Sequence, residues 1–221
     1  MSNATRTEQR PNVHEMYVIH RVFRREFTAL PGLVRATPAN DLVRAQIVGV
    51  HLRLVLGGLH MHHTGEDEVL WPRLLERAAP STNLVETMQS QHERVDAYAD
   101  QVAPLLDDWM ATGSPVRGEQ LARRLEDFAG ALFEHLDLEE REVLSLISRH
   151  ITVAEWNSLG AHGRGAMSPR QLPILFGCIL EDADKQERKM MLATLPLPVR
   201  LLMTTVGAGQ YRRYINRVRA A

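Results

Sequence analysis

HHTGEDEVL at residues 62–70 and HLDLEEREVL at residues 135–144 share one pattern, a histidine followed four residues later by a glutamate. On an α-helix, residues four apart lie one above the other on the same face. The imidazole and the carboxylate of each stretch can therefore approach one point. Two such helices facing each other would offer two imidazoles and two carboxylates to a shared centre. This ligand set suits a pair of transition-metal ions bridged by the carboxylates.

The composition favours a helical domain inside a reducing compartment. The chain has 221 residues, of which 44% are hydrophobic but only 5% aromatic, so its core must rest on Leu, Val, Ala and Met, as in helical bundles. The formal net charge of −1 gives no basic field, so we expect no nucleic-acid partner. The single cysteine, Cys178, excludes an internal disulfide framework, and we therefore expect a cytoplasmic protein.

We also expect no membrane partner. The first twelve residues are polar and lack the apolar segment of a secretory signal. No uninterrupted apolar run approaches the ~20 residues that a membrane-spanning helix needs.

Apolar residues recur at helical spacing along residues 1–150, and almost nothing is typical of a strand. We predict four long helices: residues 12–30 or beyond, with Pro31-Gly32 kinking or ending the helix; about 40–79, bent near Gly65 or Pro72; from about 82; and from about 115. Amphipathic helices joined by short polar turns predict an all-α, up-down-up-down four-helix bundle.

Residues 151–221 are predicted to be a C-terminal helical extension packed on the bundle. Thr152 and Glu155 form a capping box that opens a short helix through Trp156, residues 161–165 are typical of a linker, and Ser168 and Gln171 resemble a second capping box. Further helices are expected over about 172–180, 184–194 and 198–219. The extension has one histidine and no ligand-like cluster.

Histidines interrupt the apolar face of every predicted bundle helix. His20 on the first helix and His92 on the third join the two His-x-x-x-Glu pairs. A single histidine on an apolar face is commonly a hydrogen-bonded core residue. Histidines on four helices, with Glu66 and Glu139 one turn further on, favour a metal site. Burying these carboxylates without partners would cost several kcal/mol, and bound cations remove that cost.

The order of these motifs resembles that of the hemerythrin-like, HHE cation-binding family over about residues 14–150. The matching segments are His20, His62–Glu66 with its EDEVLWP continuation, Gln91-His92-Glu93, and His135–Glu139 with its EEREVL continuation. That family is a four-helix bundle holding two non-haem irons, bridged by an oxo or hydroxo group and two carboxylates. The resemblance implies two iron ions here, with these ligands: His20, His62, Glu66, His92, His135 and Glu139, of which the two glutamates bridge.

The chain departs from the family at one position. Oxygen-carrying members place two histidines one turn apart on the third helix, whereas His92 has Met88 and Asp96 at those spacings. Either Asp96 or His63, which adjoins His62 at the inner edge of the second helix, could complete the coordination. Fewer histidines would leave more open coordination positions. This argues against simple reversible oxygen carriage and leaves peroxide, nitric oxide or redox chemistry open.

The remaining histidines are expected to be structural: His14, His51, His60, His150 and His162. His51, for example, lies eleven residues before His62, about 16 Å along a helix, which is too far for the same centre. Gly57-Gly58 lies one turn before the second helix's ligands. It favours close packing of a neighbouring helix, and space for a small ligand is the alternative.

The sequence therefore predicts a non-haem di-iron protein that binds or reacts with oxygen, peroxide or nitric oxide, in sensing or in the oxidative or nitrosative stress response. Catalase-like peroxide decomposition and iron storage or donation are the alternatives. The Glu-x-x-His pattern of ferritin-like di-iron proteins is absent. A mononuclear site with three histidines would leave the two glutamates unexplained. The sequence decides neither the physiological ligand nor the oligomeric state.

Overall fold

The computed structural model describes residues 10–78, 81–166 and 168–220, and all regular secondary structure in these ranges is helical. The all-α prediction is therefore confirmed for the described residues. Residues 1–9, which carry most of the expectation about a secretory signal, lie outside them.

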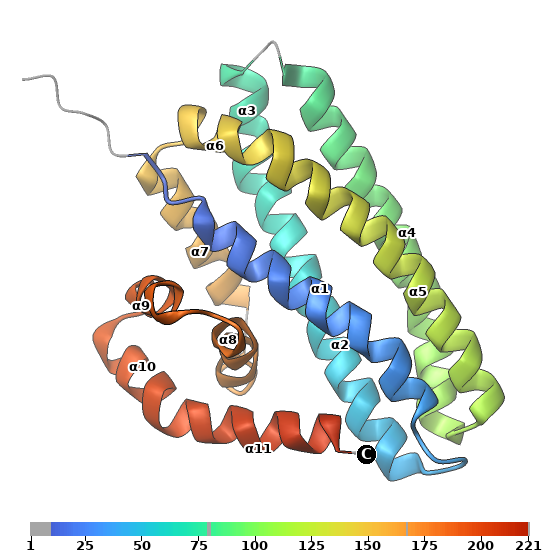
Figure 1. Ribbon diagram of the computed structural model, residues 1–221. Helices are drawn as coiled ribbons and strands as arrows, with labels where there is room; N and C mark the ends of the chain where they lie inside the picture. Colours follow the sequence, from blue (N-terminus) through green and yellow to red (C-terminus); the bar gives the residue numbers. More distant parts are fainter. Residues whose placement is uncertain (1–9, 79–80, 167, 221) are drawn as a thin grey trace, which may run out of the picture.

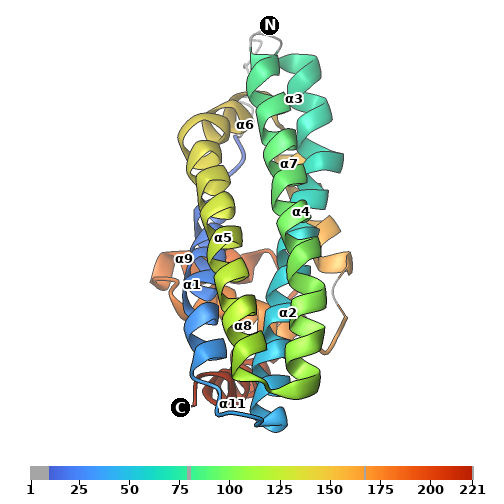
Figure 2. The same ribbon diagram turned by 90° about the vertical axis from the view of Figure 1, so that its right-hand side faces the viewer.

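Four long helical segments lie alongside one another (Figures 1 and 2). They are α1 (His14–Arg35), α2 (Leu42–Gly65) continued by η1 (Glu66–Leu70) and α3 (Trp71–Arg77), α4 (Thr82–Thr112), and α5 (Pro115–Leu138) continued by η3 (Glu139–Val143) and α6 (Leu144–His150). Helix α1 packs against α5 and α2, and α4 packs against α5 and α2. Each segment therefore has a neighbour on two sides and can bury one apolar face.

Local sequence explains where these helices start, and of the two alternatives at Pro31-Gly32, a kink or an end, the structure excludes the end. The Asp41 side chain accepts a hydrogen bond from the backbone N–H of Arg44 and caps α2. Pro115 occupies the first turn of α5, where its missing N–H costs nothing. Helix α1, however, continues through Pro31 to Arg35, because Leu30, Pro31 and Val34 are all buried in the core and packing outweighs the lost backbone hydrogen bond.

The bundle core consists of two apolar layers with buried polar residues between them. Along each long segment, the polar residues are preceded by a side chain of one layer and followed by a side chain of the other. The flanking pairs are Met16 and Phe23 on α1, Leu59 and Leu70 on α2–η1, Met88 and Val95 on α4, and Leu132 and Val143 on α5–η3. Apolar packing thus closes the polar layer at both ends.

The C-terminal part of the chain forms five further helices within the described residues. They are α7 (Val153–Ala166), α8 (Leu172–Glu181), α9 (Lys185–Ala193), α10 (Leu197–Leu202) with its continuation η4 (Met203–Gly207), and α11 (Ala208–Arg219). The capping box of Thr152 and Glu155 is confirmed by reciprocal side-chain-to-backbone hydrogen bonds. Ser168 and Gln171 make the same reciprocal pair.

The predicted linker over residues 161–165 is wrong, because α7 continues as one helix to Ala166. Helix α7 packs against α2 and η1. A methyl group at Gly65 of α2 would lie 2.9 Å from Leu159 of α7, so the two helices approach closely at that glycine. Packing against α2 keeps residues 161–165 helical, although the glycines in this segment have a low helix propensity.

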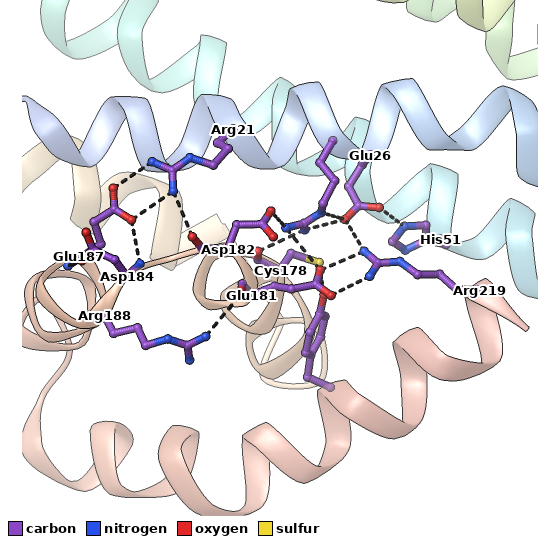
Figure 3. Close-up of polar contacts among 12 residues, drawn as sticks. Arg21, Glu26, His51, Cys178, Glu181, Asp182, Asp184, Glu187, Arg188 and Arg219 are labelled. Carbon is purple, nitrogen blue, oxygen red and sulfur yellow. Dashed lines mark hydrogen bonds and ion pairs between the residues drawn. The ribbon is translucent and has the colours of Figure 1, made fainter.

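Ion pairs tie the C-terminal helices to the bundle (Figure 3). Glu26 of α1 is buried and lies 2.6 Å from Arg25, 3.0 Å from His51 and 3.4 Å from Arg219 of α11. Arg219 also pairs with Glu181 of α8 at 2.6 Å. The expectation that His51 is structural agrees with its place in this network.

One helical segment, Leu42–Arg77, is long and apolar enough to cross a membrane, judged by length and composition alone. Core helices of bundles meet the same criterion, and 44% of its most apolar window is buried here. The absence of a membrane partner stays a prediction.

Candidate metal centre

The buried polar layer brings together all seven residues that the sequence singled out. Their ligand atoms form two groups, and within each group these atoms lie within 4.8 Å of one another. The first group is His63, His92 and His135; the second is His20, His62, Glu66 and Glu139. All seven side chains are at least nine-tenths buried.

A local change of helix type follows each His-x-x-x-Glu pair. Glu66 begins η1 and Glu139 begins η3, and both segments are π-helical, with hydrogen bonds that span five residues. The N–H of Trp71 donates to the carbonyl of Glu66, and the N–H of Leu144 donates to that of Glu139. Single π-helical turns inside α-helices occur frequently at functional sites. The bend expected near Gly65 or Pro72 corresponds to the first of these turns.

Glu66 lies between the two groups of imidazoles. Its Oε1 is 3.3 Å from His62 Nε2, in the two-imidazole group. Its Oε2 is 3.4 Å from His92 Nε2, in the three-imidazole group. The two carboxylate oxygens therefore face different sets of nitrogen ligands, as a carboxylate shared by two cations would.

Glu139 lies in the same position on the opposite segment. Its Oε2 is 3.2 Å from His20 Nε2 and 3.8 Å from His135 Nε2, so this oxygen also faces one imidazole of each group. The repeated sequence pattern thus produces a repeated geometry.

Three imidazoles are held in place from behind by side chains that the sequence argument missed. His20 Nδ1 lies 2.9 Å from Glu140 Oε1, and His92 Nδ1 lies 2.8 Å from Asp67 Oδ1. His135 Nδ1 lies 3.3 Å from the side-chain oxygen of Gln91. These acceptors favour a proton on Nδ1, which directs Nε2 into the centre. The surrounding carboxylates outweigh burial and raise the pKa of His20 to about 9 and that of His92 to about 10, so these two rings would bind a metal through Nε2 only on losing a proton. Histidines that bind metals usually have such a partner behind them.

The sequence carries a signal for these supports. In both stretches the inward glutamate is followed directly by a second acid, as Glu66-Asp67 and as Glu139-Glu140. The second acid of each stretch points to another helix, Asp67 to α4 and Glu140 to α1. Which histidine it meets depends on the tertiary arrangement, which the spacing alone does not show.

His63 occupies the place left open by the sequence analysis. Its ring stacks on that of His92, with centroids 4.0 Å apart and planes 11° apart. Neither nitrogen of His63 has a hydrogen-bond partner among the described residues. Asp96, the other candidate, is exposed and belongs to neither group. Of these two candidates, the geometry favours His63.

The electrostatics of the layer favour bound cations. Burial lowers the pKa of His62 and of His63 well below the ordinary value, and it lowers the pKa of His135 to about 3, so these imidazoles are neutral and can donate lone pairs. Burial and the neighbouring Glu139 carboxylate raise the pKa of Glu66. Burial also raises the pKa of Glu139, but the His20 imidazole outweighs this and lowers it to about 2. The ionised Glu139 carboxylate therefore opposes the ionisation of Glu66, and positive charge between the two would relieve this.

The unpaired atoms fit metal ions. Buried atoms without a hydrogen-bond partner in the described residues include both oxygens of Glu66 and Glu139, both nitrogens of His63, and Nε2 of His92 and His135. Orphaned buried polar atoms are rare in folded proteins and call for an explanation. Imidazole nitrogens and carboxylate oxygens are the donors that iron, zinc and related metals take in proteins.

The other histidines lie in neither group. His51 pairs with Glu26, His14 with Glu187 at 2.9 Å, and His162 lies 3.6 Å from Glu68. His60 is exposed and His150 half-buried. The positions of these five residues agree with the structural roles expected for them.

Comparison with known proteins gives one family. A family model described as the hemerythrin HHE cation binding domain matches residues 12–147. Neither the curated proteins nor the solved structures include a significant match. The matched range contains all seven clustered residues and ends just before α7.

Proposed function

Because the chain belongs to the hemerythrin HHE cation-binding family, we propose that its buried layer holds two non-haem iron ions and binds or reacts with small molecules. The observation that carries this proposal is the position of Glu66, whose two oxygens face two different groups of imidazoles. A mononuclear site would need only one of these groups. The proposed helix directions are up-down-up-down, which the short connections between the long helices support.

The two groups differ in a way that favours small-molecule binding. One group offers three imidazoles and the other offers two, while both carboxylates lie between them. Iron held there would supply redox chemistry and an exchangeable position for oxygen, nitric oxide or peroxide. The group with two imidazoles has fewer nitrogen ligands, so we place that position on the side of His20 and His62.

His63 changes the balance among the candidate functions. The argument against reversible binding rested on a missing histidine, and His63 supplies a fifth imidazole from another helix. Binding or sensing of a small molecule is therefore our first proposal, in the cytoplasm as the single buried thiol suggests. Storage or donation of iron is less suited to ligands sealed between two apolar layers.

Metal content and spectra test the proposal together. The protein loaded with iron should contain about two irons per chain and absorb in the near ultraviolet, where oxo-bridged iron pairs absorb. Nitric oxide should change the visible spectrum of the reduced protein. Glu66→Ala should lose most of the iron, whereas Glu93→Ala is the matched control, because Glu93 is an exposed glutamate next to His92.

Three outcomes would redirect the proposal. One iron per chain with Glu66 dispensable would reject the dinuclear centre. Iron-dependent evolution of oxygen from peroxide at a high rate would establish the catalase-like enzyme instead. Two irons that respond neither to nitric oxide nor to oxygen would leave storage as the function.

A further inference from the structure

A cavity of about 160 Å³ lies between the bundle and the C-terminal helices. Its bundle wall comes from α1 and α2, and its opposite wall comes mainly from α7 and α8. The lining is almost entirely apolar and includes Met16, Phe23, Gly58, Leu159, Leu175 and Phe176. The cavity is partly open to solvent, so a small molecule can enter it without separation of its walls.

The cavity borders the metal centre. His62, a member of the two-imidazole group, is one of its lining residues. The ring of Phe23, another lining residue, lies 5.4 Å from the His62 ring, centroid to centroid. A molecule inside the cavity would therefore lie beside the group with fewer imidazoles.

A glycine keeps the cavity open from the bundle side. A methyl group added at Gly58 would lie 3.3 Å from Leu175 of α8, whereas one added at the preceding Gly57 would meet nothing within 4 Å. Close packing, the favoured expectation for this pair, is therefore found at Gly58 but not at Gly57. Any longer side chain at Gly58 would extend toward Leu175 and take up cavity volume.

Fixed contacts on both sides of the cavity keep its walls apart. At one side, α7 meets α2 closely at Gly65. At the other, the network of Glu26, Arg219 and Glu181 holds α8 and α11 on α1, and Arg21 pairs with Glu187 of α9 at 2.8 Å (Figure 3). With the helices held at these points, the space between them does not close by a small shift of the extension.

From this combination we infer that the cavity is a binding site for a small apolar molecule about the size of benzene. An enclosed apolar cavity of about 150 Å³ binds benzene or xenon, and this partly open cavity offers a similar volume and an apolar lining. Binding in the cavity does not require the metals. Its use as a compartment that holds apolar molecules beside the centre rests on the proposed function.

The test follows methionine methyl groups during a titration with benzene. Met16, Met61 and Met191 line the cavity, whereas Met110 packs against Gly49 in the distant apolar layer. In the full-length, zinc-loaded or metal-free protein labelled with ¹³C at the methionine methyls, benzene should shift the first three signals saturably and leave that of Met110 unchanged. Because no iron is present, this result is independent of the di-iron proposal, and either can fail alone.

Paired variants make the assignment specific. Gly58→Leu should weaken benzene binding at least tenfold, whereas Gly57→Leu, its matched control, should leave it unchanged. If Gly58→Leu does not fold, Leu175→Ala decides, since it enlarges the cavity and should raise the affinity for butylbenzene relative to that for benzene. The inference is overturned by unsaturable or uniform methyl shifts, by equal binding in the two glycine variants, or by a Leu175→Ala protein with unchanged selectivity.

Discussion

At the scale of single residues, the centre depends on contacts within one helix and on contacts between helices. His62 with Glu66 and His135 with Glu139 lie together because their spacing of four is a property of any helix. Asp67 and Glu140 meet histidines of other helices, and such meetings depend on which helices are neighbours. The ligand roles of the clustered residues stay a prediction until metal is measured.

The support from Asp67 can be tested directly. Asp67→Ala should weaken iron binding by about 10- to 100-fold, because the His92 imidazole would lose the acceptor that fixes its orientation. Asp67→Asn keeps an acceptor oxygen and should recover part of the affinity. Competition with a chelator of known affinity measures both.

The exposed Glu142, which pairs with Arg141, provides the control for this substitution. Glu142→Ala should bind iron as the unaltered protein does. An Asp67→Ala protein with undiminished affinity would remove Asp67 from the site.

At the scale of elements, the sequence located the long helices but not their irregularities. The π-helical turns begin at Glu66 and at Glu139, where each helix places a buried acid in the polar layer. No spacing in the sequence predicts these turns. Helix α7 runs through a glycine-containing segment because α2 packs against it. In both cases tertiary contacts decide the local backbone, whereas sequence patterns report only propensity.

The junction of α1, α2 and α11 predicts a pH dependence. Burial raises the pKa of Glu26, but His51 and Arg25 outweigh this and lower it to about 2. An acid whose pKa is lower in the folded state stabilises the fold above its unfolded value of about 4.5, and this stabilisation is lost as the pH falls toward 2. The stabilisation at neutral pH is of the order of 3 kcal/mol.

Glu26→Gln should therefore lower the free energy of unfolding at pH 7 by a few kcal/mol, and the deficit should shrink as the pH approaches 3. Urea unfolding of the metal-free protein at several pH values measures the difference. Glu119→Gln, a surface glutamate paired with Arg35, should change stability far less at every pH. A deficit that is constant with pH would show that Glu26 acts by packing alone.

At the scale of the whole molecule, the layer of clustered histidines and glutamates is enclosed between two apolar layers. We expect this layer to stabilise the fold only when metal ions are bound in it. An ion bound by the folded chain alone stabilises it by mass action, by about 4 kcal/mol at a concentration 1,000 times the dissociation constant. For a chain of 221 residues each kcal/mol raises Tm by roughly 2–4 °C. Removal of iron should lower Tm by about 10 °C.

The metal-free protein should nevertheless stay helical, because the apolar layer around Phe27 and Phe128 contains none of the clustered residues. Thermal unfolding followed by circular dichroism, with and without iron, checks both statements. An unchanged Tm would contradict iron binding by the folded state, and a metal-free chain without helix would show that the apolar layers do not suffice.

Two of the three bonds behind the imidazoles cross between the two halves of the bundle, whereas the third, from His135 to Gln91, stays within the hairpin of α4 and α5. The hairpin of α1 and α2 holds His20, but the carboxylate behind it, Glu140, belongs to the hairpin of α4 and α5. The reverse is true of His92, whose partner Asp67 belongs to the first hairpin. Neither half-molecule alone can orient both His20 and His92, so the complete centre forms only when the two halves pack together. Metal binding at full affinity would therefore report that the two hairpins are packed together in the correct register.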